Sequence, residues 1–375
     1  MHVMTVVGTR PEVIKLSCVI AELDRAFQHT LVHTGQNYDF ELNQMFFEDM
    51  GIRRPDIFLE AAAPSAAETI ARVIQSSDEV LQELGPDAFL VYGDTNSCLS
   101  VIAAKRRQVP VFHMEAGNRC FDARVPEEIN RKVVDHLSDI NMVISEHARR
   151  YLLHEGVRAD SIIKVGSSMP EVLSSQADKI AASSVLGRMR LKPQGYLLAS
   201  MHREENVDQS ERLEGVLQGL GELTKFYGCP VVISTHPRTK QRMARFGFAA
   251  HPDTLQFVKP LAFSDYIALQ KDALCVISDS GTIAEEASLL GFPAVTIRDS
   301  HERPEGMDEG TLVMSGAGRD SILSAVFLVV DQAGRFPRPP RVVADYEADL
   351  VSRKVVRIIQ SYAPWVNRTT WSRFT

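Results

Sequence analysis

Carboxylates follow several short apolar runs of the sequence, at the points where predicted strands end. Asp94 comes directly after one such run, and Glu115 closes another. A carboxylate in this position either caps a loop, pairs with an arginine, or is tuned for proton transfer. Glu127 and Glu128 begin a predicted helix, where a negative charge compensates the helix dipole, and for Glu128 we prefer that interpretation. Asp94 and Glu115 remain open to both structural and acid–base roles.

Two histidines lie at predicted strand ends in the second half of the chain. His202 and His236 are each followed within two residues by an arginine, Arg203 and Arg238. An isolated histidine is usually structural, but two at strand ends favour a functional site. No third ligand follows at a spacing typical of metal sites, so we predict no bound metal.

A turn of small residues precedes a predicted helix near the end of the second half. Backbone N–H groups around Ser280, Gly281 and Thr282 would point at whatever lies above this turn. Amides at a helix start suit a diphosphate, because they donate hydrogen bonds where the helix dipole is positive. Glu286, about one turn further along, is a candidate to hold ribose hydroxyls.

Cationic side chains stand near two other predicted strand ends. Arg10 and Lys15 flank the start of a helix in which Thr9 and Glu12 form a capping box. Open α/β sheets bind ligands at such strand ends, so the two cations are candidate phosphate contacts. Arg303 lies in a loop dense in charge. The alternative in both places is a set of solvated charges.

Short apolar runs alternate with helical patterns along the whole chain. Runs of about four to six apolar residues are typical of parallel strands covered on both faces, and strand–helix alternation predicts a doubly wound parallel sheet. The predicted strands include Val3–Val7, His29–His33, Ala88–Tyr92, Val109–Met114, Ile140–Ile144, Tyr196–Ala199, Val231–Ser234, Ala273–Ile277 and Ala294–Ile297.

The alternation restarts after about residue 170, behind a more polar segment. We therefore predict an N-terminal Rossmann-like domain over 1–170 and a C-terminal Rossmann-like, ligand-binding domain over 171–349. Apolar residues at helical spacing predict a closing helix, within about 350–375, that packs back on the first domain.

Composition excludes several classes of protein. A net charge of -7 over 375 residues argues against bulk attraction to nucleic acid or an anionic membrane. Five cysteines without a C-x-x-C pair predict free thiols in a reducing compartment. No signal-peptide pattern or apolar stretch of about 20 residues is found, so we expect a cytoplasmic protein. No G-x-G-x-x-G fingerprint follows a strand, which argues against a bound nicotinamide cofactor.

These segments together resemble the non-hydrolysing UDP-N-acetylglucosamine 2-epimerase family. Each motif is weak alone, but the set occurs in the family's order across about residues 1–310. The resembling motifs are Gly8-Thr9-Arg10-Pro11-Glu12, Thr34-Gly35-Gln36, Gly93-Asp94-Thr95, Glu115-Ala116-Gly117, Pro126-Glu127-Glu128, His202-Arg203, Asp279-Ser280-Gly281, Glu285-Glu286 and Glu302-Arg303-Pro304-Glu305.

The resemblance implies a GT-B-like architecture, a homodimer and an active site between the domains. It implies catalytic roles for Asp94, Glu115, Glu127 and His202. The substrate-binding positions that we predict are Arg10, Lys15, His236, Tyr266, Ser280, Gly281, Thr282, Glu286 and Arg303, with Tyr266 where an aromatic ring commonly stacks on uracil.

Some positions depart from the usual family pattern. Met201 replaces the glycine before the catalytic histidine, and Asn118-Arg119-Cys120 replaces Leu-Arg-Thr. Asn37 replaces a histidine, which puts the family's regulatory second substrate site in doubt. These departures resemble a capsule and O-antigen subgroup that forms UDP-N-acetyl-L-fucosamine from UDP-2-acetamido-2,6-dideoxy-L-talose. We favour this substrate over UDP-N-acetylglucosamine.

Inversion at carbon 2 explains why such groups are needed. The proton on carbon 2 has no adjacent carbonyl and is barely acidic, so UDP must leave from carbon 1 as that proton is lost. The 2-acetamidoglycal is then reprotonated and UDP is re-added. Cations and a helix start stabilise the departing diphosphate, while carboxylates and histidine handle the protons. A GT-B glycosyltransferase and a sugar-nucleotide sensor are the alternatives.

Overall fold

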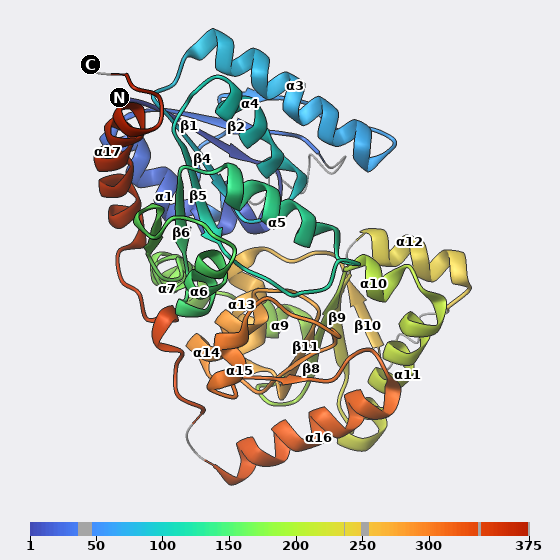
Figure 1. Ribbon diagram of the computed structural model, residues 1–375. Coiled ribbons are helices and arrows are strands. Elements are labelled where there is room, and N and C mark those ends of the chain that lie inside the picture. Colours follow the sequence, from blue (N-terminus) through green and yellow to red (C-terminus); the bar gives the residue numbers. More distant parts are fainter. Residues whose placement is uncertain (37–46, 236, 249–254, 337–338, 374–375) are drawn as a thin grey trace. The chain divides into compact units, whose positions relative to one another are not determined.

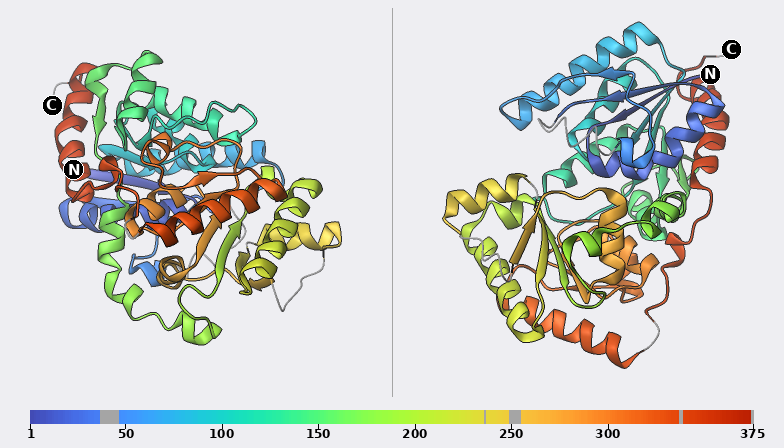
Figure 2. Two further views of the ribbon diagram at one scale, coloured as in Figure 1. Left: turned by 90° about the horizontal axis from the view of Figure 1, so that it is seen from below. Right: turned by 180° about the vertical axis from the view of Figure 1, so that it is seen from behind.

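The computed structural model describes residues 1–36, 47–235, 237–248, 255–336 and 339–373. Its internal contacts divide the chain into two compact units, which can be followed by colour in Figure 1 and Figure 2. Unit 1 comprises Met1–Ser175 and Asp345–Thr375, and unit 2 comprises Gln176–Ala344.

A parallel sheet forms the centre of unit 1. Its strands are β1 (His2–Val7), β2 (Gln28–His33), β3 (Ile57–Phe58), β4 (Ala88–Tyr92), β5 (Val111–Ala116), β6 (Ile140–Val143) and β7 (Ile162–Lys164). Within the described residues they pair in the order β3-β2-β1-β4-β5-β6-β7. All residues of β4 are buried, as expected for a central strand covered on both faces.

Helices cover both faces of this sheet. They are α1 (Arg10–Ala26), α3 (Ala66–Leu84), α4 (Val101–Arg106), α5 (Pro126–Leu137), α6 (Glu146–His154), α7 (Met169–Ser175) and α17 (Val351–Thr369), with short 3-10 turns at η1 (Asn96–Ser100), η2 (Ala159–Ser161) and η3 (Ala344–Tyr346). One apolar core lies between the sheet and the pair α1 and α17, and another contains residues of α3, α4 and α5.

The last helix, α17, lies beside α1 (Figure 1, Figure 2). Val355, Ile359 and Val366 recur at helical spacing and are fully buried in the core shared with α1. Gly166, with a φ of +86°, lies so close to the segment before α17 that a Cβ would overlap with Ala348. The C-terminal segment is therefore an integral part of unit 1.

Unit 2 repeats the same architecture. Its strands are β8 (Leu197–Met201), β9 (Val231–Thr235), β10 (Leu255–Val258), β11 (Cys275–Ser278), β12 (Ala294–Thr296) and β13 (Val313–Met314), paired in parallel in the order β10-β9-β8-β11-β12-β13 among the described residues. The helices are α8 (Ala177–Ala181), α9 (Val185–Met189), α10 (Glu204–Val207), α11 (Ser210–Tyr227), α12 (Pro237–Phe246), α13 (Phe263–Asp272), α14 (Ile283–Leu290), α15 (Pro304–Asp308) and α16 (Arg319–Arg335). None of the helices described in either unit has the length and apolar character needed to cross a membrane.

The predicted fold class of two parallel α/β sheets is confirmed. Every strand predicted from the sequence is present, with ends that differ by at most two residues. The strands β3, β7, β10 and β13 were not predicted, and each lies at an edge of its sheet. These strands are short and only partly buried, so they lack the continuous apolar run that marks a central strand.

The packing of α17 predicts a large loss of stability when its buried face is truncated. Ile359→Ala leaves a cavity in the core of unit 1, and we expect the free energy of unfolding to fall by about 3 kcal/mol. The neighbouring Ile358, which is only partly buried, is the matched control, and Ile358→Ala should cost about 1 kcal/mol. Urea titrations measure both, and equal losses would contradict this account of the helix.

Candidate active site

Glu115 lies near the carboxyl end of β5 in an uncommon backbone conformation. Its φ of +64° is in the left-handed region, and the register between β5 and β6 shifts around it. Such a bulge re-aims a side chain out of the regular alternation of a strand. Glu115 Oε2 accepts hydrogen bonds from Lys15 Nζ (2.9 Å) and the Tyr92 hydroxyl (2.6 Å). Lys15, predicted as a substrate contact, is thus also the charge partner of this carboxylate.

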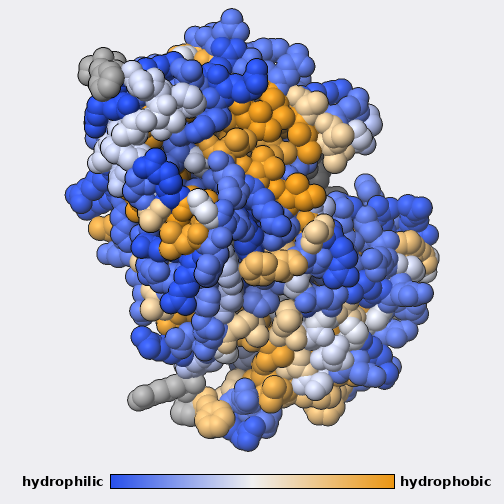
Figure 3. Space-filling model, in the orientation of Figure 1, coloured by the Kyte–Doolittle hydropathy of each residue, from blue (hydrophilic) through white to orange (hydrophobic). Residues whose placement is uncertain are grey.

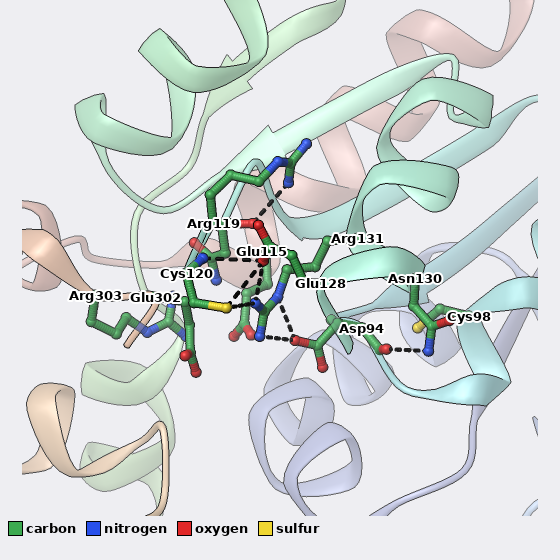
Figure 4. Close-up of polar contacts among 12 residues, drawn as sticks. Asp94, Cys98, Glu115, Arg119, Cys120, Glu128, Asn130, Arg131, Glu302 and Arg303 are labelled. Carbon is green, nitrogen blue, oxygen red and sulfur yellow. Dashed lines mark hydrogen bonds and ion pairs between the residues drawn. The ribbon is translucent and has the colours of Figure 1, made fainter. Parts of the chain in front are cut away.

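Arg131 of α5 is a buried cation that bridges Asp94 and Glu128 (Figure 4). Its Nε donates to Asp94 Oδ2 at 2.8 Å, and its Nη1 donates to Glu128 Oε2 at 2.8 Å. Asn130 Nδ2 donates to the backbone carbonyl of Asp94 at 2.9 Å. Helix α5 therefore fixes both the backbone and the carboxylate of Asp94. The sequence pattern had not indicated Arg131, although its spacing from Glu128 places the two on one helix face.

Glu128 also forms hydrogen bonds with the backbone of the loop that precedes α5. Its carboxylate accepts hydrogen bonds from the backbone N–H groups of Cys120 (3.1 Å) and Phe121 (3.2 Å). Burial acts to raise the pKa of Glu128, but the hydrogen bonds from Cys120 and the charge of Arg131 outweigh burial and lower this pKa. Glu128 thus has a structural role beyond compensating the helix dipole. Glu127 lies beside it in the first turn of α5 and is half-buried.

A further buried network supports the turns next to the two candidate carboxylates. His113 Nε2 donates to the Gly93 carbonyl at 2.7 Å, and its Nδ1 lies 2.8 Å from Asp135. Asp135 also accepts from the Gly117 N–H (3.1 Å) and from Arg119 Nη1 (2.7 Å). Burial acts to raise the pKa of Asp135, but the His113 and Arg119 contacts prevail and lower this pKa.

Glu12 connects the turn after β1 to the loop after β4. Its carboxylate accepts from the Gly8 N–H (2.5 Å), from Ser97 Oγ (3.0 Å) and from the Thr95 hydroxyl. Burial raises the pKa of Glu12 to about 7, against the opposing effect of these hydrogen bonds. The capping box alone had not indicated this second connection. Arg10 begins α1 directly after the same turn and is half-buried.

In unit 2, His202 follows β8 and lies against the buried Asp279. Its Nδ1 is 3.0 Å from Asp279 Oδ1, while its ring remains 43% exposed. The backbone N–H groups of His202 and Arg203 and the amide of Asn206 also donate to Asp279. Burial acts to raise the pKa of Asp279, but His202 and the other donors hold it well below its usual range. Asp279 thereby joins His202 to the turn that begins at residue 280.

The predicted diphosphate-binding turn precedes α14. Ser280, Gly281 and Thr282 are half-buried, and the hydroxyls of Ser280 and Thr282 are 3.0 Å apart. A Cβ on Gly281 would overlap with the carboxylate of Glu302, which Arg298 Nη1 holds at 2.7 Å. A larger residue at this position would have to displace the Glu302 carboxylate from its ion pair. A small pocket lies beside the turn and is lined by Ser280, Gly281, Arg298, Arg303 and Met307, among other residues.

Three further predicted contacts of unit 2, Glu286, Arg303 and Tyr266, have partners within the unit. Glu286 is buried and accepts a hydrogen bond from Gln270 Nε2 at 2.6 Å. Arg303 is buried, and its Nη2 lies 3.3 Å from Glu285 Oε2. The hydroxyl of Tyr266 donates to a serine of β8 at 3.1 Å. Glu286 and Tyr266 therefore occupy fixed positions on α14 and α13.

Two predicted features lie outside the described residues. These are His236, the second strand-end histidine, and Asn37, on which the question of a regulatory site depends. In the part of the chain that is described, no group of three or more His, Cys, Asp and Glu side chains is arranged to hold a metal ion.

Comparison with known proteins relates the whole chain to one family. Residues 21–360 match the family model described as UDP-N-acetylglucosamine 2-epimerase. The structure of UDP-N-acetylglucosamine 2-epimerase from Rickettsia bellii is 52% identical, covers 100% of both chains and gives a TM-score of 0.91. The crystal structure of the Methanocaldococcus jannaschii enzyme in complex with UDP-GlcNAc and UDP is 29% identical over 96% of this chain and 100% of its own, with a TM-score of 0.90.

Other relatives differ in substrate or share only the fold. The UDP-2,3-diacetamido-2,3-dideoxy-D-glucuronate 2-epimerase of Pseudomonas aeruginosa is 35% identical over 87% of this chain and 91% of its own. A glycosyltransferase of kitacinnamycin is 12% identical over 96% of this chain and 98% of its own, with a TM-score of 0.56. That likeness concerns the fold alone. The predicted GT-B-like fold is confirmed by these neighbours.

The buried Glu12 predicts a measurable pH dependence of stability. Its pKa rises from 4.5 to about 7 on folding, so its contribution is fully present below pH 4.5 and is lost as the pH rises through 7. Relative to Glu12→Gln, the wild-type free energy of unfolding should fall by about 3 kcal/mol across this range. Urea titrations at several pH values measure this difference, with the exposed Glu83→Gln as control. A difference that does not vary with pH would refute the prediction.

Proposed function

Because the chain belongs to the UDP-N-acetylglucosamine 2-epimerase family and is a non-hydrolysing UDP-sugar 2-epimerase, we propose that it inverts carbon 2 of a UDP-linked N-acetylamino sugar through a 2-acetamidoglycal. In this mechanism the C1–O bond to UDP breaks as carbon 2 loses its proton. The glycal then regains a proton on the opposite face, and UDP re-forms the bond to carbon 1. No redox cofactor is required by this sequence of steps.

The observation that carries the proposal is the pairing of strand-end carboxylates with buried cations in unit 1. Glu115 lies against Lys15, and Asp94 lies against Arg131. A glycosyltransferase also needs a nucleotide-binding turn, but it has less use for two carboxylates held in this way. An epimerase must remove and return a proton at carbon 2, which requires such groups. We therefore prefer epimerisation to glycosyl transfer.

We assign the roles of the site residues as follows. Asp94, Glu115, Glu127 and His202 act in proton transfer. Ser280, Gly281 and Thr282 bind the diphosphate through the start of α14, where amides and the helix dipole favour negative charge. The remaining substrate-binding positions are Arg10, Lys15 and Arg303 for the diphosphate and sugar, Glu286 for the ribose, Tyr266 for the uracil, and His236.

Two substrates are candidates for this site. The departures at Met201, Asn37 and Asn118 favour UDP-2-acetamido-2,6-dideoxy-L-talose, with UDP-N-acetyl-L-fucosamine as the product, and hence a role in capsule or O-antigen synthesis. The 52% identity to the Rickettsia bellii protein favours UDP-N-acetylglucosamine. We retain the deoxytalose derivative as the first candidate.

We also propose that the enzyme is a cytoplasmic homodimer. Figure 3 shows apolar side chains gathered on unit 1 in the region of α4 and α5. Ile129 of α5 is 58% exposed, although it is a large aliphatic residue. A contiguous apolar surface of this kind is typical of protein–protein contacts, and a second copy of the chain is the partner that we propose for it.

The mechanism predicts exchange of the carbon-2 proton with solvent. Each candidate UDP-sugar is incubated with the enzyme in heavy water, without added cofactor, and followed by proton NMR. We expect deuterium at carbon 2 of both epimers for the true substrate. Product that lacks deuterium would exclude the elimination mechanism, and turnover only with a sugar acceptor would favour the glycosyltransferase.

The close approach of Gly281 to Glu302 predicts that a side chain added at residue 281 weakens nucleotide binding. Gly281→Ala should displace Glu302 and disturb the turn, so that UDP binds about tenfold more weakly in calorimetric titrations. The control is Gly334→Ala in α16, where an added Cβ meets no atom within 4 Å. Equal UDP affinity in the two variants would show that the turn does not hold the nucleotide.

A further inference from the structure

Tyr92 makes a contact that neither the sequence motifs nor the proposed roles explain. It is the last residue of β4, and its side chain is 4% exposed. Its hydroxyl donates to Glu115 Oε2 at 2.6 Å, the same oxygen that receives Lys15 Nζ at 2.9 Å. The Lys15 ammonium also lies 5.7 Å from the centre of the Tyr92 ring. Three elements, α1, β4 and β5, thus converge on one carboxylate oxygen.

The backbone conformation at Glu115 directs its carboxylate towards these two donors. A glutamate with a φ of +64° is uncommon, and the bulge directs its side chain away from where a regular strand would place it. In that conformation the carboxylate meets a hydroxyl and an ammonium. A carboxylate that is largely shielded from water is stabilised by such donors, because burial of an unpaired charge is unfavourable.

We propose that Tyr92 is a positioning residue for the epimerisation, and that its hydroxyl holds Glu115 in the orientation in which the carboxylate exchanges a proton with carbon 2. This inference rests on the proposed function. Tyr92 keeps its own proton throughout, and no bond to it forms or breaks. Its effect on the sugar is exerted through Glu115 alone.

Two consequences follow from the geometry. A carboxylate that receives two donors on one oxygen has fewer available rotamers than a carboxylate that receives one. It also binds a proton less tightly, because hydrogen bonds to the charged form favour that form. Loss of the Tyr92 hydroxyl should therefore slow the proton-transfer step and make Glu115 easier to protonate, while Lys15 remains in place.

The test is Tyr92→Phe, which removes only the hydroxyl. We expect kcat for epimerisation to fall about tenfold, KM to stay within about twofold, and the acid limb of the pH profile of kcat to move to higher pH. Tyr196→Phe is the matched control. The Tyr196 hydroxyl is also buried and also donates at 2.6 Å, but its acceptor is the Leu269 carbonyl in unit 2. That variant should lose stability and keep the wild-type pH profile.

The outcomes separate a positioning role from a structural one. If Tyr92→Phe retains the wild-type acid limb, the inference is overturned, whether or not kcat and thermal stability fall. A shifted limb together with a lower kcat supports it. Failure of the proposed function itself would be seen in the wild-type enzyme, as absence of deuterium at carbon 2 with both candidate sugars.

Discussion

The pairing of carboxylates with buried cations is the constraint around which the candidate site of unit 1 is organised. A carboxylate removed from water is costly unless a cation or several hydrogen-bond donors accompany it. Glu115 lies against Lys15, Asp94 against Arg131 and Asp135 against Arg119. Lys15 and Arg131 come from helices α1 and α5, and Arg119 comes from the loop after β5, so the fold supplies the neutralising charge from outside the strands.

Unit 2 uses its buried charges differently. Asp279 is surrounded by donors and joins the strand-end histidine to the turn before α14. Arg298 and Arg303 are held by Glu302 and Glu285, so both cations of the pocket wall are already oriented. The turn itself offers hydroxyls and backbone amides rather than a formal charge. Amides at the start of a helix favour a bound anion without a formal positive charge.

Strands were predicted correctly where the local sequence pattern matches the tertiary environment of the strand. Central strands such as β4 are continuous apolar runs, and they were predicted, whereas β3 and β13 span two residues each at sheet edges and were not. The candidate carboxylates could be found because they follow those runs. Their partners could not, since Arg131 and Tyr92 are recognised only by which atoms they reach. The left-handed backbone of Glu115 likewise has no local signal, because glutamate is not a residue that favours it.

The division of the chain carries a consequence for its synthesis. Unit 1 is interrupted after Ser175 and resumes only at Asp345, and α17 supplies a face of its core. The chain is synthesised from its N-terminus, so the sheet of unit 1 emerges from the ribosome long before α17, the helix that completes its burial. Unit 2 is continuous in sequence, so all of its strands are synthesised before α17. The apolar face of unit 1 that α17 covers therefore stays exposed until the last residues have been synthesised.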